Sequence, residues 1–338
     1  MKLGLDSKPN VLFVTTGRIN PNGDLYYPPL VANQINSLQP FLRDSSLTII
    51  YSLNPLFVVR KILEVRRKSK DVDIIHAQYG SLTALIAHLG KKYKPLVISF
   101  GGSDLLGSAG KGLKWTIRNW ITRQMGLWAA NDSDCIIVKS QTLLKSLPPG
   151  LHKKTIVIPN GVDIRIFSPG NKQEARKKLG WGEGIRYVLF TPSRANNVLV
   201  KNLPLANEVL QAVNARLGSV RMEFILDKKP EQIAEMMNSA DCLLLTSLHE
   251  GSPNVIKEAM ACNLPIVTVN VGDVMERLWT VKNAYVVDSY NPELLSARVE
   301  QVLNNNERTN GIEEIKRQQL TSEDVALRII NVYNKVVK

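Results

Sequence analysis

Short apolar segments alternate with helical segments twice along this chain of 338 residues, and the alternation limits its fold more than any other feature. Such an order predicts parallel strands, joined by helices that cover both faces of a sheet. In the first half we predict strands at 11–16, 47–51, 73–76, 96–100, 135–138 and 155–158, and helices at 30–42, 56–68 and 82–89. In the second half we predict strands at 187–191, 220–225, 241–246, 266–270 and 284–287, and helices at 205–215 and 230–238. The predicted fold class is therefore α/β, with two doubly wound, Rossmann-like sheets.

The length of the chain predicts two domains, because a single hydrophobic core rarely supports so many residues. A turn-rich stretch at 159–170 is typical of a connection between domains. We therefore expect one domain at 1–165 and a second at 166–321, with the amphipathic segment 322–338 packing back on the first. Ligands of such folds bind outside the carboxyl ends of the strands, so we expect the two domains to face each other across a ligand cleft.

Cysteine content and charge narrow the class of protein. Cys135, Cys242 and Cys262 lie far apart in apolar segments without a CxxC pattern, so we expect buried thiols rather than disulfides or a zinc site. No apolar run approaches the ~20 residues of a membrane-spanning helix, and we expect a cytoplasmic protein. The net charge of +13 favours anionic partners such as phosphorylated ligands or acidic lipids. Nucleic acid is not expected as a partner, because no nucleic-acid-binding motif accompanies the charge.

Two glutamates, Glu250 and Glu258, stand eight positions apart in a strand–elbow–helix context that covers 241–261. Glu250 falls in the elbow and Glu258 almost two turns along the helix, which separates them by roughly 9 Å along the helix axis. This arrangement suits two ends of one elongated ligand, whose anionic middle lies at the helix N-terminus.

The ends of this helix are also predicted from the residue types. Ser252 is expected to cap the helix, with Pro253 as its first residue. Asn263 is expected to end the helix in a left-handed conformation, and Pro265 follows.

Two cations follow the first strand of the second half. Arg194 comes directly after this strand, and Lys201 lies in a short loop before a helix. Guanidinium and ammonium groups at the carboxyl end of a strand suit a diphosphate. The alternative is that both are solvated surface charges.

The segment 239–276 closely resembles the retaining GT-B glycosyltransferases of the large family that includes sucrose synthase and bacterial lipopolysaccharide and mannosyl transferases. The resemblance is carried by the run from Ser239 through Ser247-Leu248-His249-Glu250-Gly251-Ser252-Pro253-Asn254 and Glu258-Ala259-Met260-Ala261-Cys262 to Val267. The segment 158–163, Ile-Pro-Asn-Gly-Val-Asp, is similar to the part of the same family that precedes its interdomain linker. The resemblance spans nearly the whole chain and implies a GT-B fold.

The resemblance also implies roles for individual residues. Glu250 is implied to contact the donor sugar near the reacting carbon, and Glu258 to bind the ribose of the nucleotide. Arg194 and Lys201 are implied to stabilise the departing diphosphate as its charge develops. The elbow is implied to bind the donor through the backbone around the helix N-terminus, at Gly251, Ser252, Pro253, Asn254 and Val255. Such enzymes need no cofactor or metal, use a UDP- or GDP-linked sugar as substrate, and retain the anomeric configuration.

The first half departs from the family at two places. The family often has a histidine before Gly-Ser-Asp at the end of a strand, where this chain has Gly101. A contact with the donor sugar is therefore expected to be missing or to come from elsewhere. In the first strand-to-helix loop, Asn-Gly-Asp at 22–24 replaces the usual double glycine. Gly23 still suits a close approach of the backbone to a phosphate or an acceptor.

Two other residues of the first half stay ambiguous. His76 ends a strand, where it is either a hydrogen-bonded structural residue or a contact to the ligand. Asp104 either caps the turn that follows it or contacts the acceptor.

Residues 111–123 interleave cations with tryptophans, and Trp128 follows in the same helical stretch. A basic aromatic helix of this kind can lie in an anionic membrane interface. The alternative is that the tryptophans pack on the sheet while the cations remain in water. A peripheral position on the inner face of the membrane would suit a transferase that acts on a lipid-linked sugar.

These features together predict a retaining glycosyltransferase that moves a sugar from a nucleotide donor to a glycan or lipid-linked acceptor, in cell-envelope or exopolysaccharide synthesis. The main alternative is a non-catalytic, sugar-nucleotide-binding scaffold of the same fold, which Gly101 keeps open. A glycosidase is disfavoured, although the carboxylate spacing falls in the inverting range, because such an enzyme needs no phosphate site. An epimerase lacks specific support in the sequence.

Overall fold

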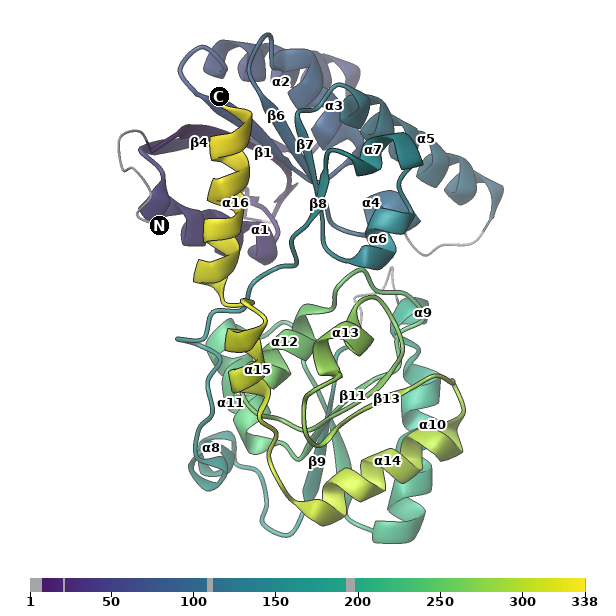
Figure 1. Ribbon diagram of the computed structural model, residues 1–338. Coiled ribbons are helices and arrows are strands. Elements are labelled where there is room, and N and C mark those ends of the chain that lie inside the picture. Colours follow the sequence, from purple (N-terminus) through teal and green to yellow (C-terminus); the bar gives the residue numbers. More distant parts are fainter. Residues whose placement is uncertain (1–7, 21, 108–111, 193–197, 338) are drawn as a thin grey trace. The chain divides into compact units, whose positions relative to one another are not determined.

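The computed structural model describes residues 8–20, 22–107, 112–192 and 198–337. The chain divides into two compact units, of which the first combines Met1–Asn160 with Ser322–Lys338 and the second is Gly161–Thr321. Each unit is built on a parallel sheet (Figure 1).

The sheet of the first unit has six strands in the order β4-β1-β5-β6-β7-β8, all parallel. Its strands are β1 (Asn10–Thr16), β4 (Asp44–Ile50), β5 (Ile74–Gln78), β6 (Leu96–Phe100), β7 (Cys135–Val138) and β8 (Thr155–Val157). A small antiparallel hairpin, β2 (Arg18–Ile19) and β3 (Leu25–Tyr26), is inserted after β1. The central strands β5 and β6 are buried along their whole length, as expected for a sheet that is covered on both faces.

Helices cover both faces of this sheet. They are α1 (Pro29–Leu38), η1 (Gln39–Phe41), α2 (Pro55–Lys68), α3 (Ser81–Gly90), α4 (Ser103–Leu106), α5 (Leu113–Asn131), α6 (Gln141–Lys145), α7 (Pro149–His152) and α16 (Ser322–Val336). On one face, α3 packs between α2 and α5 over one apolar core. On the other face, α16 packs beside α1 over a second core (Figure 1). The C-terminal helix is thus part of the first unit.

The sheet of the second unit has five parallel strands in the order β10-β9-β11-β12-β13. Its strands are β9 (Arg186–Phe190), β10 (Val220–Phe224), β11 (Cys242–Leu245), β12 (Ile266–Val269) and β13 (Ala284–Val287). Its helices are α8 (Lys172–Leu179), α9 (Val198–Lys201), α10 (Leu203–Leu217), α11 (Pro230–Ser239), α12 (Asn254–Ala261), α13 (Val274–Leu278), α14 (Pro292–Asn305) and α15 (Gly311–Arg317). Helix α10 packs against α14, α8 against α11, and α12 against α15.

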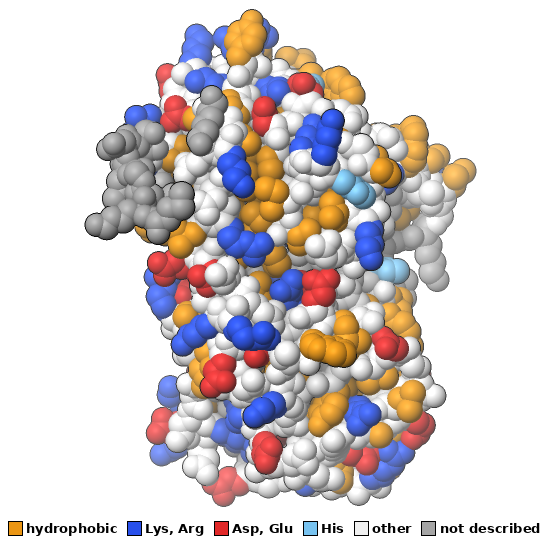
Figure 2. Space-filling model, in the orientation of Figure 1, with side chains coloured by type: hydrophobic (Ala, Val, Ile, Leu, Met, Phe, Trp, Pro, Cys, Tyr) orange, Lys and Arg blue, Asp and Glu red, His pale blue; other side chains and the backbone are white. Residues whose placement is uncertain are grey.

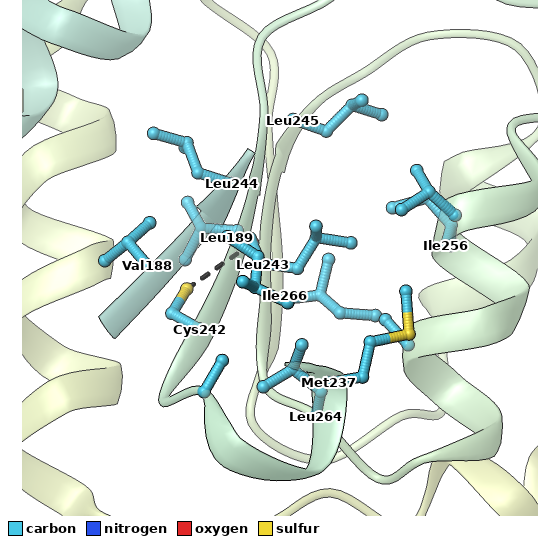
Figure 3. Close-up of a cluster of buried hydrophobic side chains, with 14 of the residues drawn as sticks. Val188, Leu189, Met237, Cys242, Leu243, Leu244, Leu245, Ile256, Leu264 and Ile266 are labelled. Atoms are coloured by element: carbon cyan, nitrogen blue, oxygen red, sulfur yellow. Dashed lines mark hydrogen bonds between the residues drawn. The ribbon is translucent and has the colours of Figure 1, made fainter. Parts of the chain in front are cut away.

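The core of the second unit gathers side chains from its central strands and the helices beside them (Figure 3). Val188 of β9, Leu243 of β11 and Ile266 of β12 are fully buried there, together with Ile256 of α12. Cys242 lies in the same core, where its thiol donates to the backbone oxygen of Leu243 at 3.4 Å. Strand β11 ends at Leu245, and the loop that follows it carries the predicted site.

The predicted fold class is confirmed: both units are α/β, with the parallel sheets that the alternation indicated. The three cysteines are buried and free, as expected. No helix in the described part of the chain is both long and apolar enough to cross a membrane.

Candidate functional site

The elbow between β11 and α12 carries most of the predicted donor site. Four buried apolar residues form β11, the chain then turns through 246–253, and α12 begins at Asn254. Its N-cap residue is Pro253, and no side chain caps the helix. The expectation that Ser252 caps the helix is therefore wrong. Asn263 follows the helix in a left-handed conformation, with φ of 54°, as predicted.

Ser252 is diverted from the helix end by a buried ionic network that the sequence did not reveal. The ammonium of Lys257, which is only 1% exposed, donates to Oγ of Ser252 at 2.9 Å. Ser252 in turn donates to Oδ2 of Asp273 at 2.8 Å. Asp273, also buried, receives a second bond from Nε of Arg277 at 2.9 Å. The network ties the elbow and α12 to the start of α13.

Burial shifts the ionisation of Lys257 and its neighbour Glu258 in opposite directions. Loss of hydration lowers the pKa of Lys257 to about 8, partly offset by the attraction of Asp273. Loss of hydration raises the pKa of Glu258 to about 7, partly offset by Lys257. A carboxyl group with this pKa exchanges its proton near neutral pH, which is unusual for a glutamate on a helix.

Glu250 and Lys201, which the sequence analysis assigned to one site, form an ion pair. Nζ of Lys201 lies 2.5 Å from Oε1 of Glu250, and both side chains are mostly buried. Thr246 anchors the end of α9 by donating from Oγ1 to the backbone oxygens of Lys201 at 2.9 Å and Asn202 at 3.0 Å. These bonds hold the lysine against the elbow. Arg194, the other predicted cation, lies outside the described residues.

Two hydroxyl groups at the carboxyl ends of strands in the second unit have no hydrogen-bond partner among the described residues. Thr191 follows β9 and Ser247 follows β11, and these two strands are neighbours. The side-chain oxygen of each is buried and unpaired within the described part of the chain. An unpaired buried hydroxyl is costly, so this edge of the sheet offers polar groups that a ligand could satisfy.

Gly272, which follows β12, is a further residue of this site that the sequence analysis missed. Its φ is +61°, and a Cβ at this position would lie 2.9 Å from the backbone oxygen of Gly251 and 3.0 Å from that of Glu250. Only glycine lets the two backbones approach so closely. The shape of the elbow around Glu250 therefore depends on this position.

In the first unit, Asp104 is a structural carboxylate. Its side chain is buried and accepts backbone N–H bonds from Gly80 at 2.7 Å, Gly102 at 2.8 Å and Gly101 at 3.0 Å. Burial raises its pKa, and these three bonds partly offset that shift. Asp104 thus joins the loops that follow β5 and β6, and the structure favours a role in holding the turn over contact with an acceptor.

The departure at Gly101 has a local explanation in Tyr79, which follows β5. A Cβ at position 101 would lie 2.8 Å from Cε2 of the Tyr79 ring, so the ring occupies the space that a side chain there would need. The Tyr79 hydroxyl is hydrogen-bonded to Ser103. Tyr79 itself has φ of 125°, a strained value for a residue with a bulky side chain.

His76 and Gly23 lie in very different surroundings. His76 is fully buried, with Nδ1 2.6 Å from the hydroxyl of Tyr333 on α16 and Nε2 2.7 Å from Oγ of Ser99. Burial lowers its pKa to about 3. Of the two interpretations the structure therefore favours the structural one. Gly23 is exposed at the tip of the β2–β3 hairpin with φ of +87°.

The tryptophans of α5 do not all pack on the sheet. Trp120 is 62% exposed and Trp128 is 54% exposed, whereas Trp115 is half-buried and lies under the guanidinium of Arg118. The interpretation in which the tryptophans cover the sheet is therefore wrong for Trp120 and Trp128. The predicted segment begins at Lys111, which lies outside the described residues.

No group of three or more histidine, cysteine, aspartate or glutamate side chains within the described ranges is placed to hold a metal ion.

Comparisons with known proteins match both units. A model of glycosyl transferases group 1 matches residues 173–319, and a model of glycosyltransferase family 4 matches residues 25–166. An uncharacterized glycosyltransferase of Methanocaldococcus jannaschii is 25% identical over 275 residues, or 77% of this chain and 72% of that protein. The N-acetyl-alpha-D-glucosaminyl L-malate synthase of Bacillus anthracis is 22% identical over 357 aligned positions, or 96% of this chain and 87% of that protein.

The fold is also similar to that of a solved structure. The structure of Anabaena HepE in complex with UDP-glucose superposes with a TM-score of 0.69 at 16% identity, covering 97% of this chain and 100% of HepE. The group 1 model includes the elbow with Glu250, Glu258 and Lys201. Since the two family models together span most of the sequence and both units have the matching fold, the chain belongs to the GT-B glycosyltransferases.

Proposed function

We propose that the protein is a retaining glycosyltransferase that moves a sugar from a nucleotide donor to a glycan or lipid-linked acceptor, in cell-envelope or exopolysaccharide synthesis. The observation that carries this proposal is the ion pair of Lys201 and Glu250 at the elbow that precedes α12, in which Nζ lies 2.5 Å from Oε1. A cation, a carboxylate and a helix N-terminus without a side-chain cap are together suited to a sugar diphosphate.

In the proposed mechanism Glu250 binds hydroxyls of the donor sugar, and Glu258 binds the ribose. Lys201 and Arg194 stabilise the diphosphate as its bond to the anomeric carbon breaks. The acceptor oxygen forms the new bond to that carbon on the same face, and a diphosphate oxygen takes the proton of the acceptor. No metal or cofactor takes part in these steps.

The donor is proposed to bind along the edge of the second sheet. Backbone groups from Gly251 to Val255 face its diphosphate, and the unpaired hydroxyls of Thr191 and Ser247 offer it hydrogen bonds. HepE, a structural neighbour, is described in complex with UDP-glucose, which supports a UDP-linked hexose as the first candidate over a GDP-linked one.

The acceptor is proposed to be reached at the membrane surface. Residues 111–128 carry cations and exposed tryptophans and would place the protein peripherally on the inner face of an anionic membrane.

Substitution of Glu250 tests the site. We expect Glu250→Ala to abolish transfer, measured as release of the nucleoside diphosphate, while the circular dichroism spectrum and the melting temperature stay close to those of the wild type. Arg194→Ala should raise the dissociation constant of the donor and lower the rate. The control is Glu231→Ala, which removes an exposed glutamate from the first turn of α11 in the same unit. Wild-type activity in Glu250→Ala would overturn the assignment.

The scaffold alternative predicts a different outcome in the same assays. A screen of nucleotide sugars by thermal shift identifies the donor, because a ligand that binds only the folded protein raises its melting temperature. A donor that binds but is neither transferred nor hydrolysed would favour the scaffold. Slow hydrolysis without an acceptor, lost in Glu250→Ala, would favour the enzyme.

A further inference from the structure

Helix α5 presents an unusual surface to solvent. Its exposed apolar residues are related by spacings of three, four or seven positions and therefore lie on one side of the helix. They are Leu113, which is 75% exposed, and Ile117, Trp120, Ile121 and Trp128. The exposed cations Lys114 and Arg118 flank this stripe, and Leu113–Asn131 contains no aspartate or glutamate. The opposite side of the helix packs into the core of the first unit through Ala129 and Ala130.

Helix α2 carries a second stripe of the same character. Leu56, which is 73% exposed, is followed at helical spacing by exposed Val59 and Leu63. The same line continues as exposed cations at Arg66 and Arg67. The one carboxylate of this helix, Glu64, is neutralised by Lys61 at 2.8 Å and by Lys68 at 2.7 Å.

The two stripes belong to one side of the first unit. Helix α3 packs between α2 and α5, and all three rest on the same apolar core. The exposed Leu89 of α3 and the fully exposed Tyr93 just after it add apolar surface between the two stripes. In Figure 2, apolar side chains project at the right-hand edge of the upper unit, where Figure 1 places α5. We call this surface the α2/α5 face.

We propose that the α2/α5 face docks on an anionic lipid bilayer, which rests on the proposed function because it brings the enzyme to a lipid-linked acceptor. Exposed tryptophans with cations beside them are typical of side chains that sit at the boundary between acyl chains and headgroups. The cations of both helices complement acidic headgroups, and the net charge of +13 agrees with such a partner. The apolar side chains enter the interface without a membrane-spanning segment.

Vesicle binding by the full-length protein tests this proposal. We expect co-sedimentation with vesicles that contain phosphatidylglycerol, little with phosphatidylcholine alone, and weaker binding as salt is added. Arg66→Glu with Arg67→Glu should weaken binding at least about 25-fold, since each cation near the surface contributes roughly fivefold. Leu113→Ser with Trp120→Ser should weaken it at least about tenfold, because less apolar surface enters the interface.

A matched control separates local contacts from overall charge. Lys177→Glu with Lys228→Glu makes the same change in net charge at exposed positions of the second unit, and this variant should bind vesicles nearly as well as the wild type. Equal loss in the control and in the arginine variant, or wild-type binding by both variants of the α2/α5 face, would overturn the proposal. Association of the protein with itself through this face, seen by light scattering and lost in the Leu113/Trp120 variant without vesicle binding, would also overturn it.

The outcome is distinguishable from failure of the proposed function. None of these substitutions touches the donor site, so hydrolysis of the donor without vesicles should stay at the wild-type rate. An enzyme that is active in solution but binds no vesicles refutes the membrane proposal alone. Absence of activity with normal vesicle binding refutes the proposed function alone.

Discussion

The raised pKa of Glu258 makes donor binding dependent on pH in a way that the structure lets us calculate. A ribose hydroxyl donates a hydrogen bond most strongly to an ionised carboxylate. With a pKa of about 7 in the free protein, Glu258 must lose its proton before it can offer that acceptor. The donor should therefore bind more tightly as the pH rises through 7.

The size of the effect follows from the fraction of the carboxyl group that is ionised. At pH 6 about one molecule in eleven carries the carboxylate, and at pH 8 about ten in eleven do. The apparent dissociation constant is the intrinsic one divided by that fraction, so it should be about tenfold higher at pH 6 than at pH 8. An ordinary glutamate with a pKa near 4.3 would give no measurable change over this range.

Isothermal titration calorimetry with the nucleotide sugar from the thermal-shift screen measures this dependence. A nucleotide sugar is the right ligand, because its diphosphate is esterified at both ends and does not titrate between pH 6 and 8. Glu258→Gln keeps the size of the side chain but removes the titration, and all other ionisable groups remain. We expect weaker binding by this variant at pH 8 and little change between pH 6 and 8. A wild-type affinity that is flat over this range, or an equal slope in Glu258→Gln, would refute the reasoning.

Three further predictions concern residues that the structure places under strain or burial. The pKa of Lys257 falls from 10.5 to about 8 on folding, so between these pH values the native state binds fewer protons than the unfolded state. The free energy of unfolding of the wild type should therefore rise by about 3 kcal/mol between pH 8 and 10.5 relative to that of Lys257→Met, as measured by urea denaturation. The pKa of His76 falls from 6.5 to about 3 on folding, so the native state again binds fewer protons than the unfolded state. The free energy of unfolding of the wild type should therefore fall by up to about 5 kcal/mol as the pH is lowered from 6.5 to 3, and that of His76→Gln should lack this decrease. Gly272→Ala should weaken donor binding and lower the melting temperature more than Gly180→Ala does. Both glycines have a positive φ, but a Cβ at Gly180 meets no atom within 4 Å. Equal effects of the two substitutions would mean that the contact of Gly272 with the elbow is unimportant.

The fold could be predicted because buried strands appear in the sequence as short apolar runs. The strands predicted at 96–100, 135–138 and 284–287 match β6, β7 and β13 to the residue. The other strands begin or end one to three residues away from the prediction. The strand expected at 47–51 is Asp44–Ile50, because its first three residues pair with β1 although they are polar. Burial of a strand on both faces leaves a clear signal, and pairing at a sheet edge does not.

The elbow could be predicted in position but not in its internal bonding. Ser252 looks like a helix cap from its neighbours alone, yet its Oγ accepts a hydrogen bond from Lys257 and donates one to Asp273, twenty-one positions downstream. Lys257 has the sequence context of a surface lysine on an amphipathic helix, and nothing local indicates that it is buried. Its partners come from the elbow and from the start of α13, so the bonding depends on tertiary contacts that no spacing rule contains.

The departure from the family pattern at Gly101 can be explained once the order of the strands is known. The sequence suggested a missing side chain at the end of β6. In the structure the ring of Tyr79, from the end of β5, fills that space. The signal was present in the sequence as an aromatic residue directly after a predicted strand, but only strand order places it beside Gly101.

The ionisable groups of Lys257 and Glu258 also bear on how the donor site responds to its ligand. Lys257 and Glu258 are adjacent and oppositely charged, yet burial shifts both pKa values towards the neutral forms, so loss of hydration outweighs their mutual attraction. If Glu258 binds the ribose as proposed, a hydroxyl that donates to its carboxylate favours loss of its proton. On that proposal the ligand opposes the upward pKa shift of Glu258. Part of the binding energy would then be spent on ionising Glu258, next to a Lys257 ammonium that is already fixed by its hydrogen bond to Ser252.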